Sequence, residues 1–252
     1  MNLRLVLIFG LVAVIAIAWS AAFVILRAAE LGGLVGPLEE RHYPSLTVVA
    51  VGTGSDYENP ERLGPSTGLA WGNHIVLVDA GRGVSEALRN AAIPVNQPEL
   101  ILLTNVLPLN TVGLDDLLYT GWLENREEPL RVLGPPGTAA LLEGLLAAHR
   151  VGAEALGRAL PLPSAGGNFE VEEVGDGYEE EIDGVTIRAG ALRGGFLPTL
   201  AWRFERGKRS VVVSGAGWAP DALVEFARDT DLLVHEAVFV PRPEDIEEAG
   251  VI

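Results

Sequence analysis

Few side chains in this sequence combine in a pattern that could carry out chemistry. The histidines are His42, His74, His149 and His235, and no two of them have a ligand-like spacing such as H-x-H. The sequence contains no cysteine, which excludes disulfides and thiolate metal sites. His235 and Glu236 could act as an acid–base pair, although a hydrogen-bonded histidine at the end of a strand is the simpler interpretation. These patterns alone predict no metal centre.

Other polar residues also have simple structural explanations. Asp79 could bind a metal, but we expect it to tie neighbouring loops together through hydrogen bonds. Asp115 and Asp116 would point about 100° apart on a helix, and acids are favoured at a helix N-terminus in any case. Ser66 lacks recognisable His–Asp partners for nucleophilic catalysis. Glu179–Glu181 is predicted to be a solvated turn, because a calcium site needs better-spaced oxygens.

Strands and helices that alternate along the chain must position these side chains. Strands are predicted at Leu46–Val51, Thr67–Trp71, Ile75–Asp79, Leu100–Thr104, Leu130–Leu133, Phe169–Val174, Val185–Ala189, Thr199–Glu205, Ser210–Ser214 and Leu232–His235. Helices are predicted at Val84–Ala92, Leu114–Leu123, Thr138–His149 and Ala222–Arg228, and a loop at Ala153–Asn168. This alternation predicts a layered α/β domain.

An uncharged apolar run, Leu5–Leu26, precedes this domain. At about 1.5 Å per residue it could cross a bilayer core, and it exceeds the roughly 7–15 residues of a signal-peptide core. We therefore expect a transmembrane anchor over residues 1–27, a juxtamembrane linker over 28–45 and a globular domain over 46–252. The last residues resemble a helix that leads into another strand, so we expect the natural domain to continue. The short N-terminal flank favours a periplasmic or otherwise extracytoplasmic domain.

The net charge of the sequence limits which classes of molecule we expect it to bind. Asp and Glu total 34 against 18 Lys and Arg, which gives a net charge of −16. Such a field repels nucleic acid, and no basic stripe is visible, so we expect no nucleic-acid partner. A basic protein surface would suit the acidic domain better.

Several short segments follow one another in a distinctive order and spacing. They are Val51–Ser55, Gly64–Thr67, Val78–Gly83, Thr111–Leu114, Gly134–Thr138, Ser210–Gly215 and Leu232–Ala237. Together they resemble the metallo-β-lactamase superfamily, and within it the branch of RNase Z and arylsulfatase-like proteins, over about residues 46–240. The resemblance implies an αββα sandwich. In most members of that branch histidines and aspartates hold two zinc ions, and a bridging hydroxide attacks a phosphoester or another ester.

Carried over position by position, the resemblance implies that the metal-binding residues are replaced. The replacements are Asn105, Leu107, Leu109, Asn110, Arg193 and Ala216. Leucine has no donor atom, and an arginine would place a fixed positive charge where a cation should sit. The final histidine would fall after Ile252, and His235 corresponds to a position beside the metals rather than to a ligand. We therefore expect a vestigial site with no metal, no cofactor and no catalytic residue.

Taken together, these observations predict a catalytically inactive, membrane-anchored pseudoenzyme. It would serve as a structural or accessory subunit of a bacterial membrane protein complex, photosynthetic or respiratory, and would bind through its N-terminal helix and its acidic domain. Ala18 and Ala22 would permit close helix packing there. Two alternatives stay open: a membrane-bound hydrolase with a non-standard or metal-free site, and a small-molecule sensor that uses the vestigial cleft.

Overall fold

The computed structural model describes residues 13–28, 38–54, 62–192, 197–215 and 220–235. The chain forms two compact units, Met1–Leu38 and Glu39–Ile252. In the first unit, residues 13–28 form a helix whose side chains are all exposed. Among the described residues, no helix combines the length and the apolar character needed to cross a membrane. The membrane-spanning helix predicted over Leu5–Leu26 is therefore not confirmed, and residues 1–12 of that prediction lie outside the described part.

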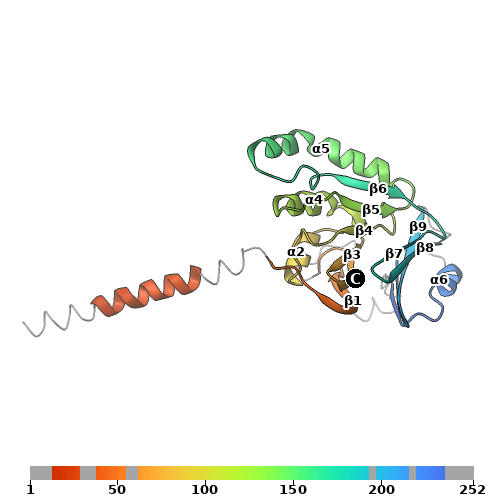
Figure 1. Cartoon of the computed structure of the whole chain (residues 1–252), viewed down its shortest axis with the longest axis horizontal. Helices are drawn as coiled ribbons and strands as arrows, with labels where there is room; N and C mark the ends of the chain where they lie inside the picture. Colours follow the sequence, from red (N-terminus) through yellow and green to blue (C-terminus); the bar gives the residue numbers. More distant parts are fainter. Residues whose placement is uncertain (1–12, 29–37, 55–61, 193–196, 216–219, 236–252) are drawn as a thin grey trace, which may run out of the picture. The chain divides into compact units, whose positions relative to one another are not determined.

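The second unit contains two β-sheets (Figure 1). The first sheet has the strand order β1-β2-β3-β4-β5-β6. These strands are β1 (Tyr43–Gly52), β2 (Ser66–Gly72), β3 (His74–Val78), β4 (Leu100–Leu102), β5 (Leu130–Gly134) and β6 (Phe169–Glu173). Strands β1 to β3 pair antiparallel, whereas β3 to β6 pair parallel. Gly72 has a φ of 56° at the β2–β3 turn, a conformation that glycine adopts without steric cost.

The second sheet has the order β11-β10-β9-β8-β7. Its strands are β7 (Glu179–Ile182), β8 (Val185–Leu192), β9 (Thr199–Arg206), β10 (Arg209–Ser214) and β11 (Leu232–His235). All neighbours pair antiparallel except β10 and β11, which run parallel, so that Ser214 lies opposite His235. Because both of these strands end at the same edge, their last side chains come together there.

Three apolar clusters define the layers of this unit. One packs α2 (Val84–Asn90), α4 (Leu114–Leu123) and α5 (Thr138–Ala159) against the first sheet. A second fills the space between the sheets and includes the fully buried Trp71, Trp202 and Phe204. The third packs α6 (Pro220–Phe226) on the second sheet. The order helices, sheet, sheet, helix confirms the predicted layered α/β domain.

Two local predictions were wrong. Helix α5 continues past His149 to Ala159 and takes up part of the predicted loop Ala153–Asn168. Its glycines only weaken a helix, and the first proline after it is Pro161. The predicted turn Glu179–Glu181 is instead in strand β7, where Glu179 pairs with Arg188 of β8 in the register and through an ion pair. The three consecutive glutamates gave no sign of a strand, because the opposite charge that offsets Glu179 lies on the neighbouring strand β8.

Candidate functional site

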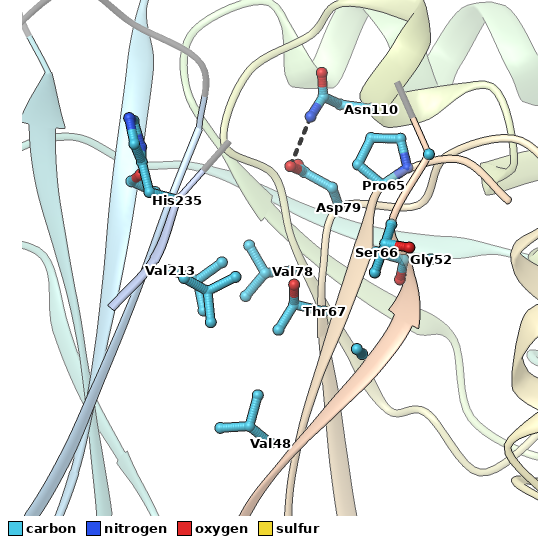
Figure 2. Close-up of a pocket in the computed structure, with 15 residues that line it drawn as sticks. Val48, Gly52, Pro65, Ser66, Thr67, Val78, Asp79, Asn110, Val213 and His235 are labelled. Atoms are coloured by element: carbon cyan, nitrogen blue, oxygen red, sulfur yellow. Dashed lines mark hydrogen bonds between the residues drawn. The ribbon is translucent and has the colours of Figure 1, made fainter. Parts of the chain in front are cut away.

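A cleft of about 350 Å³ opens between the two sheets, where β3, β10 and β11 end and β2 begins (Figure 2). Its lining includes apolar side chains from both sheets, among them Val48, Val78, Val213 and Val234. The polar lining residues are Thr53, Ser66, Thr67, Asp79, Asn110, Ser214 and His235. Figure 2 shows Asp79 and Asn110 together on one side, with His235 on the other.

Asp79 forms the centre of a buried polar network. The residue follows β3 directly, has a φ of 63° and is 6% exposed. Its Oδ1 accepts a hydrogen bond from the backbone N–H of Thr104 at 2.8 Å. Its Oδ2 accepts from Thr104 Oγ1 at 2.8 Å and from Asn110 Nδ2 at 2.7 Å. The network joins the residue after β3 to the loop after β4 and to the helix α3 (Pro108–Thr111). This confirms the predicted loop-tying role of Asp79.

The positions that were predicted to replace metal ligands differ in where they lie. Asn110 lines the cleft, but Asn105, Leu107 and Leu109 do not. Asn105 uses its Oδ1 to accept the N–H of Leu107 at 2.9 Å, which fixes the turn before α3. Arg193 and Ala216 were predicted to belong to the same site, and they lie outside the described residues.

These side chains do not fit two divalent cations. Within the described ranges, no group of three or more histidine, aspartate and glutamate side chains could hold a metal ion. Leu107 and Leu109 offer no donor atom, and Asn110 directs its amide N–H, which cannot bind a cation, at Asp79. The carboxylate of Asp79 already accepts hydrogen bonds on both oxygens. The described part of the loop after β4 therefore lacks the donor set that the resemblance implies.

A serine–histidine pair borders the cleft on its other side. Ser214 Oγ lies 2.6 Å from His235 Nδ1, and the two residues are partners in the β10–β11 register. The predicted interpretation of His235 as a hydrogen-bonded strand-end histidine is confirmed, while Glu236 lies outside the described residues. Sequence reasoning did not single out Ser214. The signal that could have found it is that two adjacent parallel strands both end in a polar residue.

The remaining candidates lie elsewhere and make structural contacts. His42 Nδ1 is 2.8 Å from Asn73 Oδ1, and His74 Nδ1 is 2.6 Å from Glu99 Oε1. At the N-terminus of α4, Asp115 Oδ2 lies 2.8 Å from the Nε2 of a histidine on α5, His149. None of these residues is part of the cleft lining.

Comparison with known proteins places this fold and cleft in a family. The sequence matches no protein-family model. It is 37% identical over 202 residues to a ribonuclease Z of Mycobacterium bovis (strain BCG / Pasteur 1173P2), with 77% of this chain and 70% of that protein covered. It is 35% identical over 198 residues to the ribonuclease Z of Mycobacterium sp. (strain KMS), with 77% and 69% covered.

Solved structures share the fold. The short form of human tRNase Z superposes with a TM-score of 0.64 at 19% identity, over 81% of this chain and 82% of that one. The metallo-β-lactamase-fold protein YhfI of Bacillus subtilis superposes with a TM-score of 0.62 at 16% identity, over 76% and 72%.

These findings overturn several predictions. The relatives bear the name of an RNA-cleaving enzyme, so the predicted pseudoenzyme, the predicted accessory subunit of a photosynthetic or respiratory complex and the exclusion of nucleic acid are wrong. The predicted single-pass membrane location and membrane-complex partner are overturned as well, because the relatives are named as ribonucleases, whose substrate is RNA. Those predictions rested on a few positions in one loop and on the apolar N-terminal run, whereas the similarity extends over 77% of the chain. By sequence and by fold, this chain belongs to the RNase Z branch of the metallo-β-lactamase superfamily.

Proposed function

We propose that this chain is an RNA hydrolase of the class for which its relatives are named, and that RNA reaches it at the cleft between the two sheets. The observation that carries the proposal is the 37% identity to a ribonuclease Z over 77% of the chain. The cleft lies where the ends of β3, β10 and β11 gather polar side chains.

The described residues can contribute to phosphodiester hydrolysis without a metal in two ways. His235, with Ser214 Oγ 2.6 Å from its Nδ1, can accept a proton at the mouth of the cleft. The buried network around Asp79 holds the opposite wall in one geometry, which positions a bound phosphodiester relative to that histidine. Zinc in this superfamily activates a water for attack, and because the described donors do not fit it, no step is assigned to a metal here.

A cleavage assay tests the proposal. The full chain is incubated with a 3′-labelled precursor tRNA that carries a 3′ extension, once with chelator and once with added zinc. We expect site-specific cleavage in at least one condition. Val48→Trp, which fills the cleft from β1, should abolish it, whereas Val224→Trp on the exposed face of α6 (65% exposed) should leave it intact. Absence of cleavage by the unmodified chain in both conditions would overturn the proposal.

A further inference from the structure

Two arginines face each other across the β9–β10 hairpin, at the opposite end of β10 from the cleft. Arg206 ends β9, Arg209 begins β10, and the two are directly opposite partners in the register. Opposite partners on neighbouring strands have Cβ atoms about 4.5–5.5 Å apart, and like charges in this position destabilise a sheet. With Lys208 in the turn, three cations fall within four residues of a chain whose net charge is −16. An anion that bridges the two guanidinium groups would relieve their repulsion.

A second pair of like charges in the same sheet has such a bridge. Arg188 of β8 and Arg203 of β9 are also opposite partners in the register. The carboxylate of Glu205 joins them, because its Oε1 accepts a hydrogen bond from Arg203 Nε at 2.9 Å and its Oε2 forms an ion pair with Arg188. At this pair the chain supplies its own bridging anion.

No described residue bridges Arg206 and Arg209 in that way. Arg206 forms no ion pair with any described residue, and Arg209 Nη1 lies 3.7 Å from Asp231 Oδ1. The Arg209 side chain is 79% exposed, and an ion pair this long and exposed contributes little. Asp231 is held instead by Ser210, whose backbone N–H donates to its Oδ2 at 2.8 Å. Both guanidinium groups are therefore open to a bound anion.

The arginine pair borders a groove of about 620 Å³ that adjoins the cleft. Leu46 of β1 and Leu232 of β11 supply apolar surface in this groove. Val48 lines both the groove and the cleft, and Figure 2 shows it at the lower end of the cleft. Along β10, the five residues from Arg209 to Ser214 at the cleft rise roughly 17 Å at about 3.3 Å per residue. Groove and cleft thus follow each other along one seam between the two sheets.

We propose that Arg206 and Arg209 together bind one phosphate group of the RNA, in the single strand that continues from the cleft along this groove. A guanidinium group can donate two parallel hydrogen bonds to phosphate oxygens, so a phosphate between the two arginines replaces their repulsion with attraction. Sites for single strands combine a positively charged groove with side chains that contact the faces of the bases. This inference rests on the proposed RNA-directed function and names a contact that lies outside the cleft.

Fluorescence anisotropy with a labelled precursor tRNA and the full chain, over a series of salt concentrations, tests the inference. Arg206→Gln should weaken binding about three- to tenfold at low salt. It should also make the slope of log affinity against log salt concentration shallower by about 0.7, the value for one phosphate contact of a single strand. The matched control Arg228→Gln removes an exposed charge beyond α6 and should change neither quantity. An unchanged slope and affinity for Arg206→Gln would refute the inference.

The length of the 3′ extension provides a further comparison. The loss should appear when the extension is longer than about five nucleotides, because a strand at about 3.4 Å per nucleotide then spans the seam. It should be absent for an RNA with a single-nucleotide extension. An equal loss for both RNAs would place the arginines against the body of the tRNA and would contradict the inference. Binding of polyglutamate but not of RNA would assign the groove to an acidic protein partner and would contradict it as well.

The melting temperature of the protein without RNA supplies an independent arm. Arg206→Gln removes one member of an unbridged like-charge pair, so the melting temperature should stay the same or rise slightly. Arg203→Gln breaks the pair that Glu205 bridges, and it should lower the melting temperature. A fall for Arg206→Gln with unchanged RNA affinity would show that a carboxylate of the chain already bridges the pair, and the inference would fail.

The RNA cleavage assay separates this inference from the proposed function. If the precursor tRNA is cleaved but Arg206→Gln binds it as tightly as the unmodified chain does, the phosphate contact is wrong and the hydrolase proposal stands. If Arg206→Gln weakens RNA binding but the unmodified chain cleaves no RNA, the phosphate contact stands and the hydrolase proposal fails.

Discussion

Removal of the Asp79 carboxylate should destabilise the domain more than most single changes. Asp79→Ala deletes hydrogen bonds from Thr104 N, Thr104 Oγ1 and Asn110 Nδ2, and it leaves these donors buried. Hydrogen bonds to a charged group contribute about 1.5–3 kcal/mol each, and bonds within one network are not additive. The whole network should therefore contribute about 4 kcal/mol. Alanine at a φ of 63° adds roughly 1 kcal/mol of backbone strain.

A loss of about 5 kcal/mol is comparable to the whole stability of a marginal domain. For a domain of this size it corresponds to a fall in melting temperature of roughly 10–20 °C. Urea denaturation of the full chain, followed by tryptophan fluorescence, measures it directly. Trp202 is a suitable reporter, because its Nε1–H donates to the carbonyl of Leu103, next to Thr104, at 3.1 Å.

Two further variants separate the causes. Asp229 has a φ of 56° and is exposed, so Asp229→Ala isolates the backbone strain and should cost about 1 kcal/mol. Asp79→Asn keeps an acceptor for Thr104 N, and its new N–H can face Asn110 Oδ1 once the Asn110 amide turns over, so it should cost about half as much as Asp79→Ala. The reasoning would be refuted if Asp79→Ala were no more destabilising than Asp229→Ala.

Three other predictions concern metal, packing and pH. After exposure to zinc and dialysis, elemental analysis should find much less than one zinc per chain, and chelator should not lower the melting temperature; one retained equivalent would contradict the absence of a fitting donor set. Gly166→Ala should destabilise the domain by more than about 2 kcal/mol, because a Cβ there would collide with the carbonyl of Arg126. The control Gly152→Ala lies in α5 with open space around it, and it should stabilise the domain by about 0.5–1 kcal/mol. Burial and the nearby carboxylates of Glu180 and Glu172 raise the pKa of Tyr178 to about 12. Because a tyrosine in the unfolded chain titrates near about 10, the stability that Tyr178 contributes is present below pH 10 and is lost between about pH 10 and 12. Tyr178→Phe should therefore reduce the fall in melting temperature between pH 9 and 11.

The layered fold was predictable because its strands and helices carry strong local signals. β-branched runs marked β3 and β10, and a glycine at the end of β2 marked the hairpin turn. Helix α4 was predicted with the bounds that the structure shows, since the apolar period of Leu114–Leu123 is regular. Strand β7 was missed because the positive charge that offsets Glu179 is carried by Arg188 on β8. No local pattern within β7 contains that information.

The candidate site was predictable only in part. The ordering of Asp79 by hydrogen bonds followed from its place after a strand, whereas its partners Thr104 and Asn110 depend on how two separate loops meet. The pair of Ser214 and His235 depends on the β10–β11 register, which places the ends of two strands side by side. Ser66 Oγ and Asn110 Oδ1 are buried and have no hydrogen-bond partner among the described residues. The sequence could not predict this, because it results from the packing around each side chain.

The structure also explains how the loop after β4 keeps its shape without a donor set for metal. The backbone N–H of Ala80 donates to the carbonyl of Asn110 at 2.8 Å, and the N–H of Gly113 donates to the carbonyl of Ala80 at 2.9 Å. A Cβ on Gly113 would strike the carbonyl of Gly81, so the absence of a side chain there lets the loops approach. Together with the side-chain bonds to Asp79, these contacts fix the loop at both ends. A cation is therefore not needed to hold this wall of the cleft.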